Sequence, residues 1–319
     1  LGRDKLDGGL GADSLFGGDG DDVYYVDNSL DRVVEYAEKG RDTVHASVSY
    51  VVDDNIEVVW ASGLDDIDLT AGDQWVELFG NGGDNVLRSG VGGGILFGGY
   101  GNDLLIGNAG DDIYYTFFDN PVVVEAENSG VDVIVTMLKH TKVAENVEYV
   151  YMHGTLAYGV DGGVGDDRIF GTQWSNSLRG GLGDDYLSGG EGNDIYVFGR
   201  GDGQDVVADA DIFGGNEDRL IFQGDIANDQ LWFSQVGQNL QIDLIGSQDR
   251  VTVNGWFNGT ANHVEVIEAG GHALSHTNVS ALVQAMAAFA PPGSGETTLS
   301  SSYQQQLNPT LAAAWAPQA

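Results

Sequence analysis

One nine-residue pattern, G-G-x-G-x-D-x-(apolar)-x, recurs along this chain and limits what the chain can fold into. Clear copies lie at residues 8–16, 17–25, 98–106 and 180–188. Glycines at positions one, two and four permit turns with positive φ and close backbone approach. Positions seven to nine predict a short strand whose apolar residue at position eight faces a core. The pattern therefore predicts turns and strands in strict alternation, stacked as a repeat architecture.

The repeats fall in three blocks, at residues 1–31, 80–115 and 162–197. Position six holds an acid or an amide in nearly every copy, namely Asp4, Asp13, Asp22, Asp31, Asn85, Asp103, Asp112, Asp167, Asn176, Asp185 and Asp194. Gly94 takes this position in one copy of the second block. The sequence begins inside a repeat, because Gly2, Asp4 and Leu6 fit positions four, six and eight. We therefore expect it to be a piece of a longer protein.

The acidity of the chain limits its partners. Asp and Glu number 49 against 13 Lys and Arg, which gives a formal net charge of -36. Such a surface repels nucleic acid and anionic membranes, so neither is an expected partner. Disorder is not expected either, because 42% of the residues are hydrophobic and 10% are aromatic. The chain has no cysteine and no apolar run long enough to span a membrane. A chain both acidic and apolar suggests that cations complete its fold.

The repeat has the chemistry of a calcium site. Its turns direct backbone carbonyls inward and position six adds a carboxylate, while Ca²⁺ takes six to eight oxygens at about 2.3 to 2.6 Å. Two repeats make one coil, so turns two repeats apart stack, and a cation between them takes one position-six residue from each. The predicted pairs are Asp4/Asp22, Asp13/Asp31, Asn85/Asp103, Gly94/Asp112, Asp167/Asp185 and Asn176/Asp194. We expect on the order of six to ten ions.

The predicted ligands are the position-six residues and the turn glycines. In the first block they are Asp4, Gly8, Gly9, Gly11, Asp13, Gly17, Gly18, Gly20, Asp22 and Asp31. In the second they are Asn85, Gly98, Gly99, Gly101, Asp103, Gly107, Gly110 and Asp112. In the third block and the turn after it they are Gly162, Gly163, Gly165, Asp167, Asn176, Gly180, Gly181, Gly183, Asp185, Gly189, Gly190, Gly192, Asp194, Asp202 and Asp205. Sites at Gly94, Asn85 and Asn176 should be weaker, and those at Gly94 and Asn85 are alternatively vestigial.

The segments between the blocks resemble each other. Tyr24-Tyr25, Glu35, Gly40 and Asp42 recur about ninety residues later as Tyr114-Tyr115, Glu125, Gly130 and Asp132, and Asn55-x-Glu57 recurs as Asn146-x-Glu148. Both segments are rich in Val and Tyr with alternating polarity, which predicts strands. The sequence therefore indicates a duplicated module followed by a third repeat block.

The last third of the chain has another pattern. Apolar runs predict short strands at 219–222, 231–233, 239–244 and 250–253. From about residue 275, Glu296 is the only acid and there is no Lys or Arg. Helical spacing joins Val279, Leu282, Val283 and Met286. We expect this tail to be loosely attached, and the alternative is a docked helix that covers the β core.

The repeats resemble those of the RTX (repeats-in-toxin) family of haemolysin-type calcium-binding proteins. Tandem copies at 180–188 and 189–197 carry the resemblance, together with the turn at 198–205 and the residues 219–268, which are similar to the β domain that often follows. The resemblance implies a parallel β-roll that folds on external Ca²⁺ and an uncleaved C-terminal signal for a type I secretion exporter. It also implies a secreted, extracellular or bacterial cell-surface location. The departures at Gly94, at the poor turn 171–176 and at the long inserts favour several short rolls.

The predicted fold is all-β, with parallel β-roll blocks that hold Ca²⁺ between stacked turns, β-rich inserts, a C-terminal β domain and a short, partly helical tail. The expected domains are repeat block one with its insert at 1–79, block two with its insert at 80–161, block three with the terminal turn at 162–209, a β-sandwich-like capping domain at 210–274 and the secretion signal at 275–319.

No catalytic residue is predicted, because the chain has neither His-Glu-x-x-His nor Gly-x-Ser-x-Gly. The expected function is a non-enzymatic, calcium-binding folding and secretion module at the C-terminal end of a larger exported bacterial protein. One alternative is a cell-surface adhesin module that binds a carbohydrate or protein ligand, which an exposed aromatic row would favour. Another is the RTX region of a secreted polysaccharide-acting enzyme or hydrolase, which a cleft with convergent carboxylates would favour.

Overall fold

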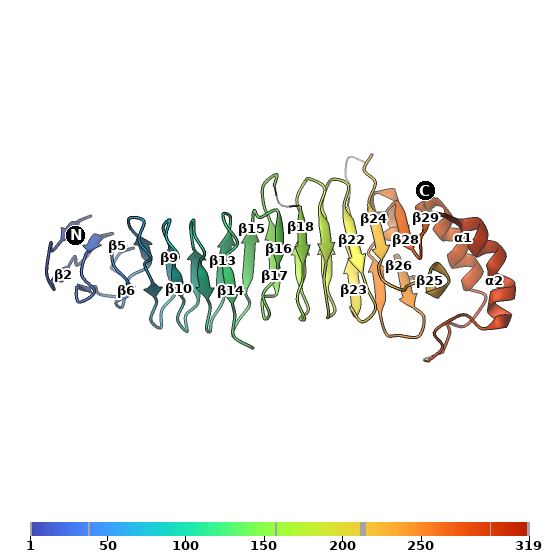
Figure 1. Cartoon of the computed structure of the whole chain (residues 1–319), viewed down its shortest axis with the longest axis horizontal. Coiled ribbons are helices and arrows are strands. Elements are labelled where there is room, and N and C mark those ends of the chain that lie inside the picture. The colour runs from blue at the N-terminus through green and yellow to red at the C-terminus, as the bar shows by residue number, and fades with distance from the viewer. Residues whose placement is uncertain (1, 38, 157, 211–214, 294, 318–319) are drawn as a thin grey trace. The chain divides into compact units, whose positions relative to one another are not determined.

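The computed structural model describes residues 2–37, 39–156, 158–210, 215–293 and 295–317. Its regular structure is almost entirely β (Figure 1), in two compact units, Leu1–Leu138 with Ala144–Tyr149 and Lys139–Val143 with Val150–Ala319. The predicted all-β fold with parallel roll blocks is confirmed. The finer domain boundaries stay predictions. Residues 211–214 of the expected capping domain and 294, 318 and 319 of the expected tail lie outside the described residues.

The first unit is a roll of parallel strands that alternate between two walls. One wall contains β1 (Lys5–Asp7), β3 (Val23–Val26), β5 (Thr43–Ala46), β7 (Val58–Ala61), β9 (Val76–Phe79), β11 (Gly94–Phe97), β13 (Asp112–Thr116) and β15 (Val133–Thr136). The other contains the pair β2 (Ser14–Phe16) and β4 (Arg32–Val34), then β6 (Tyr50–Val51), β8 (Leu69–Thr70), β10 (Val86–Arg88), β12 (Leu104–Ile106) and β14 (Val122–Val124). Within the repeat blocks the register joins residues 18 apart, as between Lys5 and Val23, so two repeats make one coil as predicted.

The core of the roll lies between the walls and is filled by alternate residues of each strand. Position eight of the repeat faces this core, since Leu15, Tyr24, Leu105 and Tyr114 are all buried. Burial of such a side chain stabilises the fold by about 1.5 to 3 kcal/mol. The coil is narrow, so each one contributes only a few such residues, and the acidic turns close the core at its edges.

The strand-rich segment between the first two repeat blocks continues the roll. β5 pairs in parallel with β3 and β7, and β7 pairs with β9, so the wall runs unbroken through this segment. The expectation of several short rolls is therefore wrong for this unit. Asn55 supplies the turn that a repeat glycine would otherwise make, because it adopts a φ of 63° and its Nδ2 donates to the Glu35 carbonyl at 3.1 Å.

The second unit has the same construction. One wall contains β17 (Tyr149–Met152), β19 (Arg168–Phe170), β21 (Tyr186–Ser188), β23 (Gln204–Val207), β27 (Arg250–Val253), β26 (Asn239–Leu244) and β25 (Leu231–Val236). The other contains β16 (His140–Lys142), β18 (Gly159–Asp161), β20 (Ser177–Arg179), β22 (Ile195–Phe198), β24 (Arg219–Phe222), β28 (Val266–Ala269), β29 (His272–Ser275) and β30 (Trp315–Pro317). The pairing becomes antiparallel from β27 through β25 and from β28 through β30.

The C-terminal part of this unit, residues 219–317, forms an apolar cap. Besides its strands it contains the short 3-10 helices η1 (Asn228–Gln230), η2 (Trp256–Asn258) and η3 (Thr260–Asn262) and the helices α1 (His276–Met286) and α2 (Ser301–Ala314). In the part of the chain that the structure describes, neither helix is long and apolar enough to cross a membrane. The cap is therefore built from strands and two surface helices around one apolar interior.

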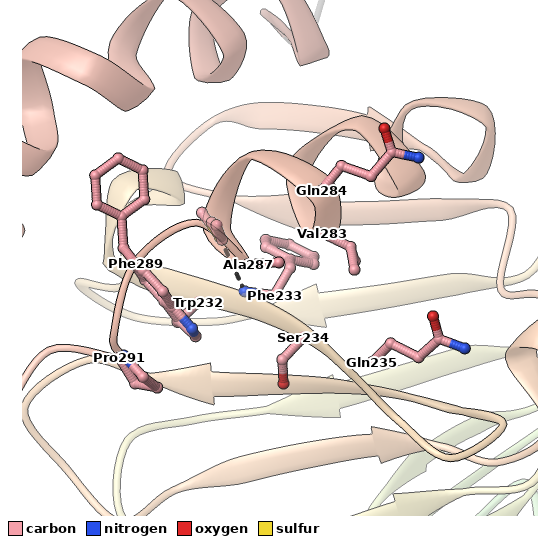
Figure 2. Close-up of a pocket in the computed structure, with 10 residues that line it drawn as sticks. Trp232, Phe233, Ser234, Gln235, Val283, Gln284, Ala287, Phe289 and Pro291 are labelled. Atoms are coloured by element: carbon pink, nitrogen blue, oxygen red, sulfur yellow. Dashed lines mark hydrogen bonds between the residues drawn. The ribbon is translucent and has the colours of Figure 1, made fainter.

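The expectation of a loosely attached tail is wrong. The four predicted helix positions Val279, Leu282, Val283 and Met286 are all buried in α1. Figure 2 shows α1 lying over β25, where the Phe233 N–H points to the Met286 sulfur at 3.1 Å. The two elements border an apolar pocket of about 380 Å³. The tail then returns to the sheet, because β30 pairs with β29. Helical spacing had indicated one apolar face, and the cap supplies the surface that it covers.

Candidate calcium sites

The position-six side chains form a ladder along the turns. In each step the Oδ1 atom of one aspartate accepts a hydrogen bond from the backbone N–H of the position-six residue one coil earlier. The steps are Asp4 to Asp22, Asp13 to Asp31, Asn85 to Asp103, Asp167 to Asp185 and Asn176 to Asp194, at 2.7–2.9 Å. Five of the six predicted pairs are thus neighbours, and the sixth, Gly94/Asp112, pairs through β11 and β13 without a Gly94 side chain.

The ladder holds one carboxylate oxygen of each aspartate and turns the other inward. The Oδ2 atoms of Asp13, Asp22 and Asp185 are buried and accept no hydrogen bond from the described residues. Burial, then the neighbouring acids, raise the pKa of Asp185 to about 6 and that of Asp205 to about 8. A buried anionic oxygen without a donor is costly, and a calcium ion is the partner that such oxygens fit.

The turn glycines have two separate roles. Positions two and four adopt positive φ, for example 92° at Gly18 and 137° at Gly20, and Gly9, Gly11, Gly99, Gly101, Gly110, Gly181, Gly183, Gly190 and Gly192 do the same. Position one does not, contrary to expectation, and it is glycine for lack of space. A Cβ at Gly8 would lie 2.6 Å from the Cβ of Asp13, and comparable clashes with the aspartate of the same repeat occur at Gly17, Gly98, Gly107, Gly162, Gly180 and Gly189.

Two predicted glycine positions depart from this scheme. Gly163 and Gly165 are not among the glycines with positive φ, and Gly163 donates its N–H to Asp167 Oδ2 at 2.8 Å. The turn that opens the third block therefore satisfies part of its own carboxylate.

The two asparagines at position six already have hydrogen-bond partners within the protein. Asn85 accepts the Asn81 N–H at 2.8 Å and donates to the Ile67 carbonyl at 2.9 Å. Asn176 accepts the Thr172 N–H at 2.7 Å. An amide that already has protein partners gains less from a cation than a bare carboxylate does. This geometry supports the prediction that the Asn85 and Asn176 sites are weak.

Two predicted ligands at the block ends have protein partners. Asp31 Oδ2 accepts the N–H groups of Asp27 and Asn28 at 3.2 and 3.1 Å. Asp202 accepts the Gly199 N–H at 2.6 Å and lies 3.5 Å from Arg179. Asp205 instead belongs to the ladder, since its Oδ1 accepts the Asp185 N–H at 3.0 Å.

Position five forms a second ladder at the surface. Asp184 is exposed, and its Oδ1 accepts the Gln204 N–H while its own N–H donates to Asp166. The exposed acid thus braces the turn from outside and the buried Asp185 faces the interior. Positions five and six therefore have different roles, one at the surface and one in the interior.

The ladder runs past the repeats to residues that sequence reasoning missed. Asp22 and Asp112 donate their N–H groups to Asp42 and Asp132, both at 2.8 Å and 20 residues ahead. The next step is a glutamate, because Asp42 donates to Glu57 and Asp132 to Glu148. In the second unit Asp194 donates to Asp218 and Asp218 to Glu265. The recurrence of Asp42 and Glu57 as Asp132 and Glu148 was the available signal.

Comparison with known families agrees with this geometry. The family model described as the RTX calcium-binding nonapeptide repeat (4 copies) matches residues 1–32, 89–116 and 175–205. The chain therefore contains RTX calcium-binding nonapeptide repeats. A second model, described as the haemolysin-type calcium binding protein related domain, matches residues 239–271 within the cap. The repeats therefore bind calcium, and the ladder carboxylates are the groups that fit the ion.

The chain is also similar to a curated protein, Endo-1,3-1,4-beta-glycanase ExsH of Rhizobium meliloti (strain 1021). The two are 33% identical over 79 residues, which are 25% of this chain and 15% of the glycanase. The chain therefore aligns with only a small share of that relative's length.

Proposed function

We propose that this chain is a non-catalytic folding module of a larger exported bacterial protein, and that external calcium completes its fold. The supporting observation is the ladder of buried carboxylates, whose inward oxygens at Asp13, Asp22 and Asp185 accept no hydrogen bond from the described residues. Without cations these stacked acids repel one another. Each bound ion stabilises the folded chain by RT ln(1 + [Ca]/Kd), about 1.4 kcal/mol for each tenfold excess.

Calcium titration tests this function. Circular dichroism of the chain in EDTA should lack most of the strand signal, and millimolar Ca²⁺ should restore it. Extracellular calcium modules have Kd values of about 10⁻⁴ to 10⁻³ M, so the midpoint should fall in that range. Magnesium at the same concentration is the control. Identical spectra in EDTA and in calcium would contradict the proposal.

We further propose that the tail, residues 275–319, is the signal that a type I secretion exporter reads, and that it is read before the chain folds. In the folded chain α1 buries its apolar face and β30 completes a sheet, so the segment is accessible only while the cap is unfolded. The roll, which depends on calcium, would then fold after export, where the calcium concentration is high.

Deletion of residues 276–319 separates export from folding. Export should stop, and full-length Asp184→Ala, an exposed change in the roll, should be exported like the wild type. Because the tail is docked, the truncated chain should also lose cap stability when calcium is present. Normal export of the truncated chain would contradict the signal assignment.

An adhesin function has one structural feature in its favour. Six aromatic residues lie in register across the outer face of one wall, namely Tyr25, His45, Trp60, Phe79, Phe97 and Tyr115. The rings contact one another along the row, however. Tyr25 stacks on His45, Trp60 and Phe79 are parallel with centroids 4.0 Å apart, and Phe97 meets Phe79 and Tyr115 tilted or edge-on. Since a sugar would need those ring faces, we place this function second.

Binding assays test the aromatic row. Titration of the calcium-bound chain with a soluble β-glucan, followed by tryptophan fluorescence, should give no saturable change under this reading. A saturable change that Trp60→Ala removes, while the exposed control Trp174→Ala keeps it, would make carbohydrate binding the better function.

Membership in a secreted polysaccharide-acting enzyme is the remaining proposal for the parent protein, and the similarity to the glycanase supports it distantly. The pocket beside α1 does not supply such an activity, since the residues that line it include no carboxylate.

A further inference from the structure

Three groups of buried acids stand where the coil of the roll lengthens. In each, two ladder aspartates meet a third carboxylate that lies outside the nonapeptide pattern, and one ligand oxygen from each residue lies within 4.8 Å of the other two. The groups are Asp22, Glu35 and Asp42, then Asp112, Glu125 and Asp132, then Asp194, Asp209 and Asp218. We name them the carboxylate clusters.

Each cluster combines a longer coil with an acid that returns from the opposite wall. Ladder steps inside the repeats span 18 residues, whereas Asp22 to Asp42 and Asp112 to Asp132 span 20. Glu35 directly follows β4 and Glu125 directly follows β14, so each glutamate returns toward the turn from the opposite wall. The third cluster has the same plan with a step of 24 residues and Asp209 after β23.

A tyrosine fixes the third carboxylate. The hydroxyl of Tyr24 donates to Glu35 and that of Tyr114 to Glu125, and Tyr196 donates to Asp209 at 2.7 Å. All three tyrosines occupy position eight and are fully buried. A Cβ at Gly17 would collide with the Tyr24 hydroxyl and with the cluster carboxylates. The acids are therefore held in a closed, preformed arrangement.

The charge of the first two clusters has no counterpart in the protein. Among the described residues, no Lys or Arg forms an ion pair with any of their six acids. Asp22 Oδ2, Asp112 Oδ1 and Asp132 Oδ2 are buried and lack a hydrogen-bond donor, and all three side chains are 0% exposed. Burial raises the pKa of Asp112 and of Asp132 to about 7.

The geometry fits one hard cation. Two oxygens bound to the same calcium ion at about 2.3 to 2.6 Å are at most about 5 Å apart, and the cluster oxygens satisfy this limit. Zinc prefers nitrogen and sulfur ligands, and magnesium retains water in a strict octahedron. A buried set of three carboxylates favours calcium over both.

We propose that each carboxylate cluster binds one calcium ion, with Glu35, Glu125 or Asp209 as the third carboxylate, in a site that combines one turn aspartate with two acids from outside the nonapeptide pattern. The proposal rests on the proposed calcium function of the roll. Calcium affinity rises with the number of charged ligands, so these sites bind more tightly than turns with two acids. The chain then has two classes of site, and a chelator empties the clusters last.

Anomalous diffraction from crystals of the wild-type chain grown with calcium is the direct test. A peak should lie between Asp112, Glu125 and Asp132, with separate peaks beside turn residues such as Asp185. Turn peaks without a cluster peak would overturn this proposal and leave the calcium function intact. Absence of peaks at both places would overturn the two together.

Calcium content gives an independent readout. Glu125→Gln, dialysed at a free calcium concentration that keeps it folded by circular dichroism, should lose one bound ion per chain by elemental analysis. Glu127→Gln is the matched control, because Glu127 is exposed two residues away and should lose none. Unchanged content in folded Glu125→Gln would contradict the proposal. If that variant does not fold, the wild-type diffraction result decides.

Discussion

The roll and the cap of the second unit fill their interiors with opposite kinds of side chain. The roll buries acids, among them Asp167, Asp185 and Asp205, beside single apolar residues such as Leu187. The cap buries Phe233, Trp256, Leu274 and many other apolar side chains, and none of its described residues that is buried carries a charge. The roll therefore depends on an external ion for its interior, whereas the cap carries its own driving force.

This difference makes stability a local property of the chain. A repeat structure is held together by contacts between neighbouring coils, so loss of the ions weakens every coil of the roll at once. The cap instead resembles a small domain with a shared apolar interior. Calcium should thus affect the stability of the roll far more strongly than that of the cap.

The largest expected effect is that of calcium removal. In EDTA, backbone amides of β21 in the roll should lose their protection from hydrogen exchange, while those of β29 in the cap keep most of theirs. Hydrogen-exchange mass spectrometry of the full chain with and without calcium measures both. Equal loss in the two regions would show that the cap depends on the ions as much as the roll does.

A core truncation in the cap should be nearly as strong but independent of calcium. Leu282, which is 1% exposed on α1, should cost about 2 to 5 kcal/mol when replaced by alanine. Gln284→Ala, on the exposed face of the same helix, is the control. Thermal unfolding at two saturating calcium concentrations checks this. If more calcium restored the stability of Leu282→Ala, the cap would not be independent of the ions.

A substitution in the ladder should change the calcium dependence of folding rather than the stability of the cap. Asp185→Ala removes an inward carboxylate and the acceptor of the Asp167 N–H, so the calcium midpoint for folding should rise about tenfold, near 1.4 kcal/mol. Asp184→Ala should shift it less, since Asp184 is exposed. Titrations followed by circular dichroism compare the two, and equal shifts would contradict the inward and outward roles.

Acid should partly replace calcium. Burial raises the pKa of Asp185 to about 6 and of Asp205 to about 8, so the folded chain binds more protons than the unfolded chain between about pH 4 and pH 8. Stability without calcium should therefore fall as pH rises through this window. Circular dichroism in EDTA from pH 5 to pH 8 measures the strand signal that remains, and a larger strand signal at pH 8 would contradict this sign.

The smallest expected effect is a gain in calcium affinity. Asn85→Asp exchanges a self-satisfied amide for a carboxylate and removes the bond to the Ile67 carbonyl. Calcium should then bind a few times more tightly while the calcium-free chain becomes slightly less stable. Isothermal titration against wild type would detect it. Unchanged affinity would show that the second-block turn does not hold an ion through this position.

Sequence reasoning reached the parts of the structure that strict periodicity encodes. The nine-residue spacing predicted the coil, the inward position eight and five of the six neighbouring pairs. The spacing did not predict the sites where the coil lengthens. Asp42 and Glu35 belong to a coil of 20 residues, two more than the 18 residues of two repeats. The recurrence of both residues ninety positions later was visible, but only the parallel register shows that they meet Asp22.

The tail was misread for a related reason. The spacing of Val279 and Leu282 identified the face of α1, yet nothing local to the helix indicates that Phe233 lies opposite. The sequence pattern did not identify the apolar face of α2, in which Leu307, Leu311 and Ala314 are buried at helical spacing and Pro309 lies inside the helix. The docking of α1 and the burial of α2 both depend on packing partners that lie far away in the sequence.

The ladder also has a direction. The N–H of Asp167 is held by Asp185, and the N–H of Asp185 by Asp205, so each coil is completed by the one that follows it in sequence. The cap folds around its own apolar interior, so we expect it to present the first ordered edge, from which the roll grows coil by coil toward the N-terminus. Assembly of this kind gives the molecule a kinetic polarity, in which the cap is fixed before the coils that precede it in the sequence.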